Sequence, residues 1–568
     1  MPTRRVTLLA VFCLTVPAAA QQNSSVPKLS ENIDVSIVNL DVIVTDKRGA
    51  HVHGLTKDDF EIRENGKSQP ITNFAEYRGG AAPPPAESQP QLQASPPPGQ
   101  PRTLVLFVDR FYLPKIKADP FFAALKETLH RTVRPGDSLM IATWYRGLLR
   151  IRHSFEDLPD GFDAIIDAIA NETVGAAIDD FQQAKREADE ASEFEREAAA
   201  MAASHGATFG DTTFSARTGA YGRAKIAQFE QKRKISTLQA LIRAISANEG
   251  KKLLLLATHR LSNIAGAEFL YAAGQTVMDI GTYTDLRADL DLRALEQTAN
   301  ANGVTVYTMY PEGLLTSDDL DASNAGYDRY SSPTASGSDA QVVQYQILEN
   351  ETLSLGEISR QTGGTSEWGP NSAKLLASIE DDLENYYSLA YRVRGGAPDR
   401  PRNLVVNAKN REYVVRSRRS VVAKSEVTRM EDRVISALFR APESSLFHVS
   451  VAIGTPRPDR KKWIVPITLQ IPIASLTALP DGNAFAGAFS VYAAWGSKFQ
   501  RVSETTHDTK LFRIPAGEIA KARQSHYTYS FDVLSDGKAD RLSLGVLDEV
   551  SKDYALRVVD LPNGPVSR

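Results

Sequence analysis

The chain has 568 residues, which at about 150 residues per domain corresponds to roughly three or four domains. Its 65 Lys and Arg residues against 69 Asp and Glu residues give a net charge of -4, which excludes a chain-wide attraction to nucleic acid or to an anionic membrane. The single cysteine, Cys13, excludes cysteine-based zinc sites, thiol catalysis and disulfide frameworks.

Residues 1–20 are typical of a signal peptide. The pair Arg4-Arg5 precedes an apolar run over residues 6–16, and small residues end at Ala20, where we expect cleavage. The run is shorter than the roughly 20 apolar residues that a membrane-spanning helix needs. Bulky Phe12 before Cys13 disfavours a lipoprotein signal, and the residues after the arginine pair disfavour a twin-arginine signal. We therefore predict an exported protein, periplasmic or secreted, without a membrane span.

Two short segments follow. Residues 33–78 contain Val- and Ile-rich runs, and the Asn65-Gly66 pair between strand-like runs predicts a hairpin, so this segment is predicted to be a small β-unit. Residues 79–100 are rich in proline and poor in large apolar side chains, and they are predicted to be a linker.

The segment 101–395 alternates strand-like and helix-like patterns. Its continuous apolar runs include 104–108, 138–145, 252–257 and 304–310, which is typical of strands buried on both faces of a parallel sheet. The fold class predicted here is α/β, with a doubly wound, mostly parallel sheet. A charged stretch leads into a further helix, and together they suggest a helical insertion over about 177–250.

The remaining residues are predicted to be mostly β-structure. Residues 396–424 are interpreted as a β extension, and its arginines, Arg411, Arg416, Arg418 and Arg419, as strand-edge charge or as a contact for an anionic surface polymer. Residues 425–568 contain short strand-like runs separated by Asp-Gly and Gly-Ser turns, which favour an antiparallel β-sandwich.

Several of these motifs together resemble a von Willebrand factor A domain. They are LVLFVD (104–109), RPGDSLMIATW, KLLLLATHR, ANANGVTVYTMYPEGL and ISRQTGGTSEW. With VNLDVIVTDKRGAHVHGLTKDDFEIRENGKSQPITNF and IEDDLENYYSLAYR, the chain more closely resembles the VWFA-related family described from acidobacterial secreted proteins, over about residues 33–420.

The resemblance implies a Mg²⁺ or Mn²⁺ site at the carboxyl edge of the sheet. Such a site uses an Asp-x-Ser-x-Ser loop, a threonine and a second aspartate. Asp109 matches the first aspartate, but Phe111 and Leu113 replace the serines, and Thr258-His259 stands where Thr-Asp is expected. A hard cation needs several oxygen ligands, so we expect Asp109 to be a remnant and no cofactor to bind. The alternatives are that Asp109 caps a helix or bonds backbone N–H groups, or that Asp109 and His259 hold Zn²⁺, for which two ligands are too few.

Two functions remain open at this stage, and the sequence contains no catalytic motif that favours an enzyme. The first is a protein-binding module of the adhesion type, with a partner-binding rim formed by Asp109, Phe111, Leu113, Thr258 and His259. The second is a carbohydrate-binding or envelope-active protein that acts through the C-terminal domain, with Trp463, Tyr492 and Trp495 stacking on sugars.

Overall fold

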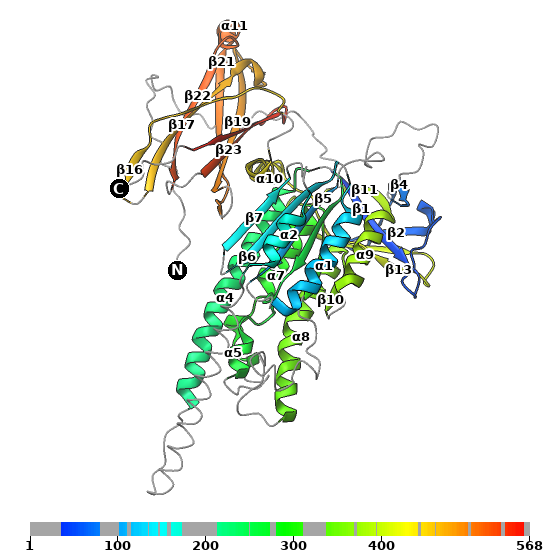
Figure 1. Ribbon diagram of the computed structural model, residues 1–568. Coiled ribbons are helices and arrows are strands. Elements are labelled where there is room, and N and C mark those ends of the chain that lie inside the picture. The colour runs from blue at the N-terminus through cyan, green and yellow to red at the C-terminus, as the bar shows by residue number, and fades with distance from the viewer. Residues whose placement is uncertain are drawn as a thin grey trace. The chain divides into compact units, whose positions relative to one another are not determined.

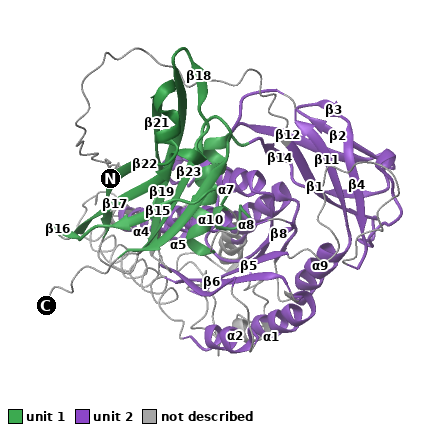
Figure 2. Cartoon of the chain, turned by 90° about the horizontal axis from the view of Figure 1, so that it is seen from above, with its two compact units in different colours: residues 1–34, 243–247, 424–568 green, residues 35–242, 248–423 purple. Residues whose placement is uncertain are grey.

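The computed structural model divides the chain into two compact units (Figure 2). Unit 1 contains residues 243–247 and 424–568 and unit 2 contains residues 35–242 and 248–423, apart from the segments left undescribed. The structure describes residues 36–79, 102–110, 115–134, 136–145, 148–155, 161–172, 213–248, 250–272, 280–310, 337–368, 372–393, 395–440, 445–460, 462–497, 501–535 and 540–561. The predicted signal peptide and almost all of the predicted linker lie outside these residues.

Unit 2 contains a six-stranded sheet in the order β10-β9-β8-β5-β6-β7. All neighbouring strands pair in parallel except β7, which pairs with β6 in the antiparallel sense. Numbered from β5, the order is 3-2-1-4-5-6, that of a doubly wound sheet. The prediction of a mostly parallel sheet is confirmed. The strands are β5 Thr103–Asp109, β6 Ser138–Tyr145, β7 Leu148–Ser154, β8 Lys252–Ala257, β9 Val304–Tyr310 and β10 Ser366–Trp368.

Helices cover both faces of this sheet (Figure 1). One face shares an apolar core with α1 (Lys115–Thr132), α2 (Asp163–Ala170) and α9 (Ser372–Glu384). The opposite face carries α4, α7 and α8, of which α7 and α8 contact β9. Their bounds are α4 Thr213–Ala244, α7 Asp289–Ala301 and α8 Gly337–Thr362, and a short helix, α5, spans Ala267–Ala272.

The insertion predicted over about 177–250 is helical in its second half, as expected, but that half is not an insertion. Residues 173–212 lie outside the described residues, and 213–244 form the single helix α4. Its later turns bury Ile235, Leu238 and Leu241, each less than 4% exposed. A helix with such an apolar stripe covers the sheet, so this part of the chain belongs to the core of the α/β part.

Residues 36–78 do not form a self-standing β-unit. Strands β1 and β4 pair with the two edges of β11, a strand that follows α9, and β2 pairs with β12. Two four-stranded sheets, β13-β1-β11-β4 and β14-β12-β2-β3, share one apolar core. The strands are β1 Ser36–Thr45, β2 Phe60–Glu64, β3 Lys67–Gln69, β4 Ile71–Tyr77, β11 Tyr386–Val393, β12 Pro401–Ala408, β13 Val414–Arg416 and β14 Ser420–Val422.

We call residues 36–78 and 386–422 the composite β part. The predicted boundary at 395 and the predicted extension over 396–424 are therefore corrected: both segments complete the N-terminal strands. The reason is physical, because a short hairpin alone is marginally stable, and periodicity cannot assign the mostly apolar β11 to one sheet or another. The hairpin at Asn65-Gly66 is confirmed, with φ of 48° and 80° at these residues.

Buried charges connect the composite β part to the α/β part within unit 2. Asp382 of α9 is 1% exposed, and it accepts hydrogen bonds from Tyr307 Oη at 2.7 Å and from Arg416 at 2.7 Å. Arg418 donates to the Asn300 carbonyl at 3.0 Å, and burial lowers the pKa of its guanidinium. The prediction of strand-edge charge is therefore wrong for Arg416 and Arg418, which lie at an internal junction.

Unit 1 consists of two antiparallel sheets that share one apolar core. A helix that was not predicted, α10 (Glu426–Phe439), packs Met430, Val434 and Leu438 against the second sheet. The strands are β15 Ser450–Ile453, β16 Arg457–Asp459, β17 Lys462–Pro472 and β22 His526–Ser535 in one sheet, and β18 Leu479–Asp481, β19 Ala484–Ser497, β20 Arg501–Val502, β21 Thr506–Pro515, β23 Asp540–Asp548 and β24 Tyr554–Asp560 in the other. A single-turn helix, α11, spans Ile519–Ala522.

No helix within the described segments is long and apolar enough to cross a membrane.

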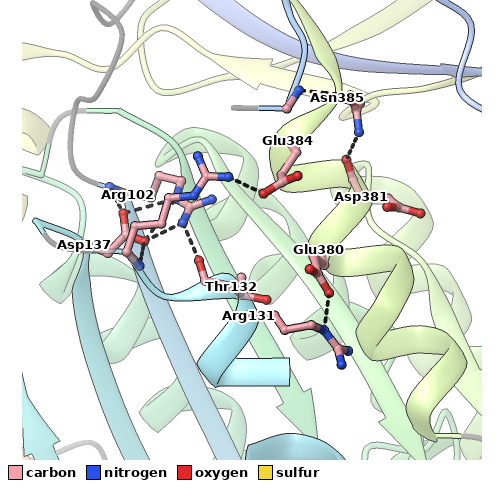
Figure 3. A network of polar contacts seen from close by, with 10 residues as sticks. Arg102, Arg131, Thr132, Asp137, Glu380, Asp381, Glu384 and Asn385 are labelled. Carbon is pink, nitrogen blue, oxygen red and sulfur yellow. Dashed lines mark hydrogen bonds and ion pairs between the residues drawn. The ribbon is translucent and has the colours of Figure 1, made fainter. Parts of the chain in front are cut away.

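A polar network at the amino edge of the six-stranded sheet explains part of the RPGD motif (Figure 3). Asp137 accepts hydrogen bonds from Arg102 Nη2 at 2.5 Å and from the backbone N–H groups of Arg102 and Arg134. Both side chains of the pair are buried, at 11% and 4% exposure. Two arginines at and just after the end of α1 form ion pairs with α9, Arg131 with Glu380 and Arg134 with Glu384. These ion pairs hold the two helices together at this edge.

We predict that Asp137→Asn lowers the free energy of unfolding by about 3–5 kcal/mol, because Arg102 is then left buried without its counter-charge. Urea denaturation followed by circular dichroism measures this. The matched control is Asp167→Asn, which removes a 54% exposed carboxylate from an ion pair with Lys126 and should hardly move the midpoint. Equal effects of the two substitutions would contradict the structural role of Asp137.

Candidate functional site

The candidate site lies where the strand order of the six-stranded sheet reverses. Strands β5 and β8 are neighbours there, and their connections run to opposite sides of the sheet. In open α/β sheets, ligands bind at this switch point, outside the carboxyl ends of the strands. Asp109 is the last residue of β5, and Thr258 directly follows β8. The sheet thus brings together two of the predicted site residues that are 149 positions apart.

A lysine ammonium occupies the position beside Asp109. Lys234 Nζ lies 2.5 Å from Asp109 Oδ2, 3.3 Å from Thr258 Oγ1 and 2.6 Å from the His259 carbonyl oxygen. Thr258 Oγ1 also lies 3.1 Å from Asp109 Oδ2. The side chains of Lys234 and Asp109 are 2% and 0% exposed. A buried ion pair with this set of hydrogen bonds satisfies both charges inside the protein.

Helix α4 positions this lysine. Lys234 lies on the buried face of α4, one turn before Leu238 and two turns before Leu241. Lysine is almost never fully buried unless it is paired. A lysine within the apolar stripe of a helix is therefore the sequence signal that could have identified it, and the sequence analysis missed it.

Side chains of two helices, α4 and α8, hold the loop after β8 in place by hydrogen bonds. On the α4 side, Gln231 Nε2 donates to the Ser262 carbonyl at 2.8 Å, and Gln231 Oε1 accepts from Ser262 N at 3.2 Å. On the α8 side, Asn350 Nδ2 donates to the Ile264 carbonyl at 2.9 Å, and Asn350 Oδ1 accepts from Ile264 N at 3.1 Å. Arg260 adopts a φ of 52° and forms an ion pair with Glu268 at 2.7 Å. Because a left-handed arginine is strained, these contacts are needed to hold the loop in place.

Other large side chains fill the space around the ion pair. The His259 ring is 2% exposed and packs edge-on against Tyr310 with centroids 4.4 Å apart. Arg110 is 1% exposed, lies over the Phe122 ring at 5.3 Å and donates to the Glu172 carbonyl at 3.0 Å. The carboxyl edge is therefore packed with side chains around Asp109.

The predicted partner-binding rim is corrected by these exposures. Asp109, Thr258 and His259 are buried, at 0%, 0% and 2% exposure, so their side chains do not form a binding surface. Phe111 and Leu113 lie outside the described residues. The structure pairs Asp109 with the Lys234 side chain, and the alternative role of Asp109, as a cap or a partner of backbone N–H groups, stays a prediction.

The residues present do not fit the divalent cation implied by the resemblance. The Asp109 carboxylate already faces a fixed positive charge 2.5 Å away, and a second cation there would be repelled. Within the described part of the chain, no group of three or more His, Cys, Asp or Glu side chains is placed to hold a metal ion. The Asp109–His259 zinc alternative lacks a third ligand there.

The aromatic trio proposed for sugar stacking is also corrected. Tyr492 is 0% exposed and packs against α10 in unit 1, so it cannot stack on a sugar. Trp495 is half-buried against the shared core of the two sheets, and Trp463 is half-buried on β17. The C-terminal domain therefore does not present these three side chains as a platform.

The chain matches no protein-family model and no curated protein. Among solved structures it has weak similarity to the open conformation of the pilus adhesin SpaC from Lactobacillus rhamnosus GG, with a TM-score of 0.26 and 8% identity, covering 84% of this chain and 56% of that chain. A β-glucosidase from Kluyveromyces marxianus in complex with glucose gives a TM-score of 0.13 and 11% identity, covering 59% of this chain and 33% of that chain. Neither likeness carries an argument about fold or function.

We predict that Lys234→Met lowers the free energy of unfolding by about 3–5 kcal/mol, because it leaves the Asp109 carboxylate buried and unpaired. The double variant Lys234→Met/Asp109→Asn should lose less than the sum of the two single variants, since no lone charge remains. Urea denaturation of the four proteins gives this coupling directly.

Lys232→Met is the matched control, because Lys232 is on the same helix with a 54% exposed side chain. We expect it to be nearly neutral. Additive effects of the two single variants would contradict a direct Lys234–Asp109 interaction.

Proposed function

We propose that this protein is an exported protein-binding module of the adhesion type, rather than an enzyme, and that its α/β part is a von Willebrand A-like domain. The strand order of the six-stranded sheet and the position of Asp109 at the end of β5 support this. The observation that carries the proposal is the Lys234 ammonium beside Asp109. A built-in positive charge stands where a family member would place its metal ion.

This substitution changes how a partner is bound. In a metal-dependent site, the carboxylate of a partner fills an open coordination position of the cation. Lysine has three N–H donors, and here Asp109, Thr258 and the His259 carbonyl lie within hydrogen-bond distance of them. No donor remains for a partner carboxylate. The partner is therefore bound by other surface side chains, and its affinity does not depend on divalent cations.

The dependence on divalent cations is directly testable. Residues 21–568, immobilised, are exposed to an envelope extract of the source cells in buffer with EDTA or with Mg²⁺ and Mn²⁺. We expect one reproducible partner that is captured to the same extent in both buffers. It should also elute from the immobilised protein to the same extent in both. No reproducible partner would contradict the binding function, and a partner lost in EDTA would contradict the role given to Lys234.

Export is proposed from the N-terminal sequence and is tested separately. We expect the protein recovered from the envelope or medium to begin at Gln21, because the small residues 18–20 form the cleavage site. N-terminal sequencing of the natural protein measures this. Protein that retains Met1 in the cytosolic fraction would contradict it.

A further inference from the structure

A cavity of about 530 Å³ lies between helices α7 and α8 in unit 2. Strands β12 and β14 border it, and Figure 2 shows α7 in the same region as these strands. The volume is in the range of small-molecule sites in proteins, about 300–1,000 Å³. Its lining residues have charged, amide or hydroxyl side chains, with Leu292 and Pro401 as the exceptions, so the fitting ligand is polar.

One buried acceptor in the lining is left without a donor. Asn300 is 2% exposed, and its Nδ2 donates to the Gln361 carbonyl at 3.1 Å and to Ser420 Oγ at 2.9 Å. A carbonyl only accepts hydrogen bonds, so this contact fixes the orientation of the amide. Its Oδ1 has no hydrogen-bond partner among the described residues. A buried acceptor without a donor is costly, and a ligand N–H or O–H group would satisfy it.

Two exposed arginines, Arg293 and Arg419, border the cavity. The guanidinium groups of Arg293 and Arg419 form no ion pair with a described residue, although both border the cavity. The other charged groups are already paired: Asp289 with Arg287 at 2.7 Å, Glu357 with Arg360, and Arg402 with Glu64 at 2.9 Å. The cavity therefore has two cations outside any ion pair, although Arg293 also interacts with the Glu296 carboxylate. Together the two guanidinium groups match a ligand carboxylate.

Glu296 adds a titratable group to the lining of the cavity. It forms no ion pair with a described residue, and burial raises its pKa to about 7 although Arg293 and Arg360 oppose this shift. The charged groups that border or neighbour the cavity are Asp289 and Arg293 on α7, Glu357 and Arg360 on α8, Arg402 on β12, and Arg419 before β14. When Glu296 is neutral, it is a hydrogen-bond donor and repels no anion.

We propose that this cavity binds a small carboxylate ligand that carries an N–H or O–H donor near its carboxylate. Arg293 and Arg419 bind the carboxylate, and the ligand donor binds Asn300 Oδ1. The amides of Asn263, Gln297 and Asn403 line the same cavity and are available for further hydrogen bonds. Two sources share this chemistry, a sugar acid and an N-acylated amino acid.

Isothermal titration of the full chain at pH 6 with two acids and their neutral analogues tests this. The probes are galacturonic acid against galactose, and N-acetylalanine against N-acetylalaninamide. We expect saturable binding of at least one acid, about tenfold or more tighter than its neutral analogue, because a charge-assisted pair is lost in the analogue. The acid that binds identifies the source. Binding of neither acid, or equal binding of acid and analogue, would overturn the proposal.

The arginines are tested with the acid that binds. Arg293→Ala/Arg419→Ala should weaken it about tenfold or more, whereas Arg411→Ala/Arg63→Ala, which removes two exposed arginines that do not line the cavity, should leave the affinity unchanged. Circular dichroism confirms that each variant is folded. Unchanged affinity in the Arg293/Arg419 variant would place the ligand elsewhere and overturn the assignment.

The titration of Glu296 gives an independent readout. Affinity for the acid should fall several-fold between pH 5.5 and pH 8.5, because ionised Glu296 repels the ligand carboxylate. Glu296→Gln should bind with nearly the same affinity at both pH values. An equal fall with pH in wild-type and variant would show that Glu296 does not face the ligand.

The stability of the ligand-free protein should depend on pH in the same direction. The folded-state pKa of Glu296 is raised to about 7 from 4.5, so the unfolded chain ionises first and ionisation favours unfolding. The stabilisation that this group contributes to the folded state is fully present below pH 4.5. It is lost as the pH rises through 7. Urea titrations from pH 5 to pH 8 should show a smaller fall in Glu296→Gln, and identical profiles would contradict the raised pKa.

Discussion

The buried Lys234–Asp109 ion pair is the interaction on which the carboxyl edge of the α/β part depends. It ties the end of β5, the start of the loop after β8 and the middle of α4 to a single point. Both charges are out of contact with water, so removal of either one leaves the other uncompensated. The ammonium supplies the positive charge that the buried Asp109 carboxylate needs.

A second buried charge, on Asp382, has the same role at the junction inside unit 2. Its carboxylate accepts hydrogen bonds from Tyr307 of the six-stranded sheet and from Arg416 of the composite β part. Burial beside this carboxylate raises the pKa of the Tyr307 hydroxyl, so it stays a donor at any physiological pH. The chain enters the composite β part, leaves it for the α/β part and returns, and this junction fixes the two parts to each other.

The sequence predicted the features that depend on local pattern. The buried strands β5, β6, β8 and β9 follow from continuous apolar runs, and the Asn65-Gly66 hairpin follows from its turn residues. Asp109 was located correctly because it ends such a run. The features that sequence reasoning missed depend on contacts between distant residues. Lys234 lies 125 positions from Asp109, and β11 pairs with strands more than 300 positions away. Helix α10 was missed for a different reason, because its apolar stripe was read as part of a β-rich region.

We propose that the Lys234 ammonium occupies the place of the divalent cation that a von Willebrand A-like domain would hold beside Asp109. Thermal melting of the wild-type protein and of Lys234→Ala in EDTA, Mg²⁺ and Mn²⁺ tests it most directly. A cation that binds only the folded state at a hundredfold excess over its dissociation constant adds about 2.7 kcal/mol of stability. We predict the same melting temperature for the wild-type protein in all three buffers. A rise in Mg²⁺ or Mn²⁺ that disappears in Asp109→Ala would show that this edge binds a metal and would contradict the account.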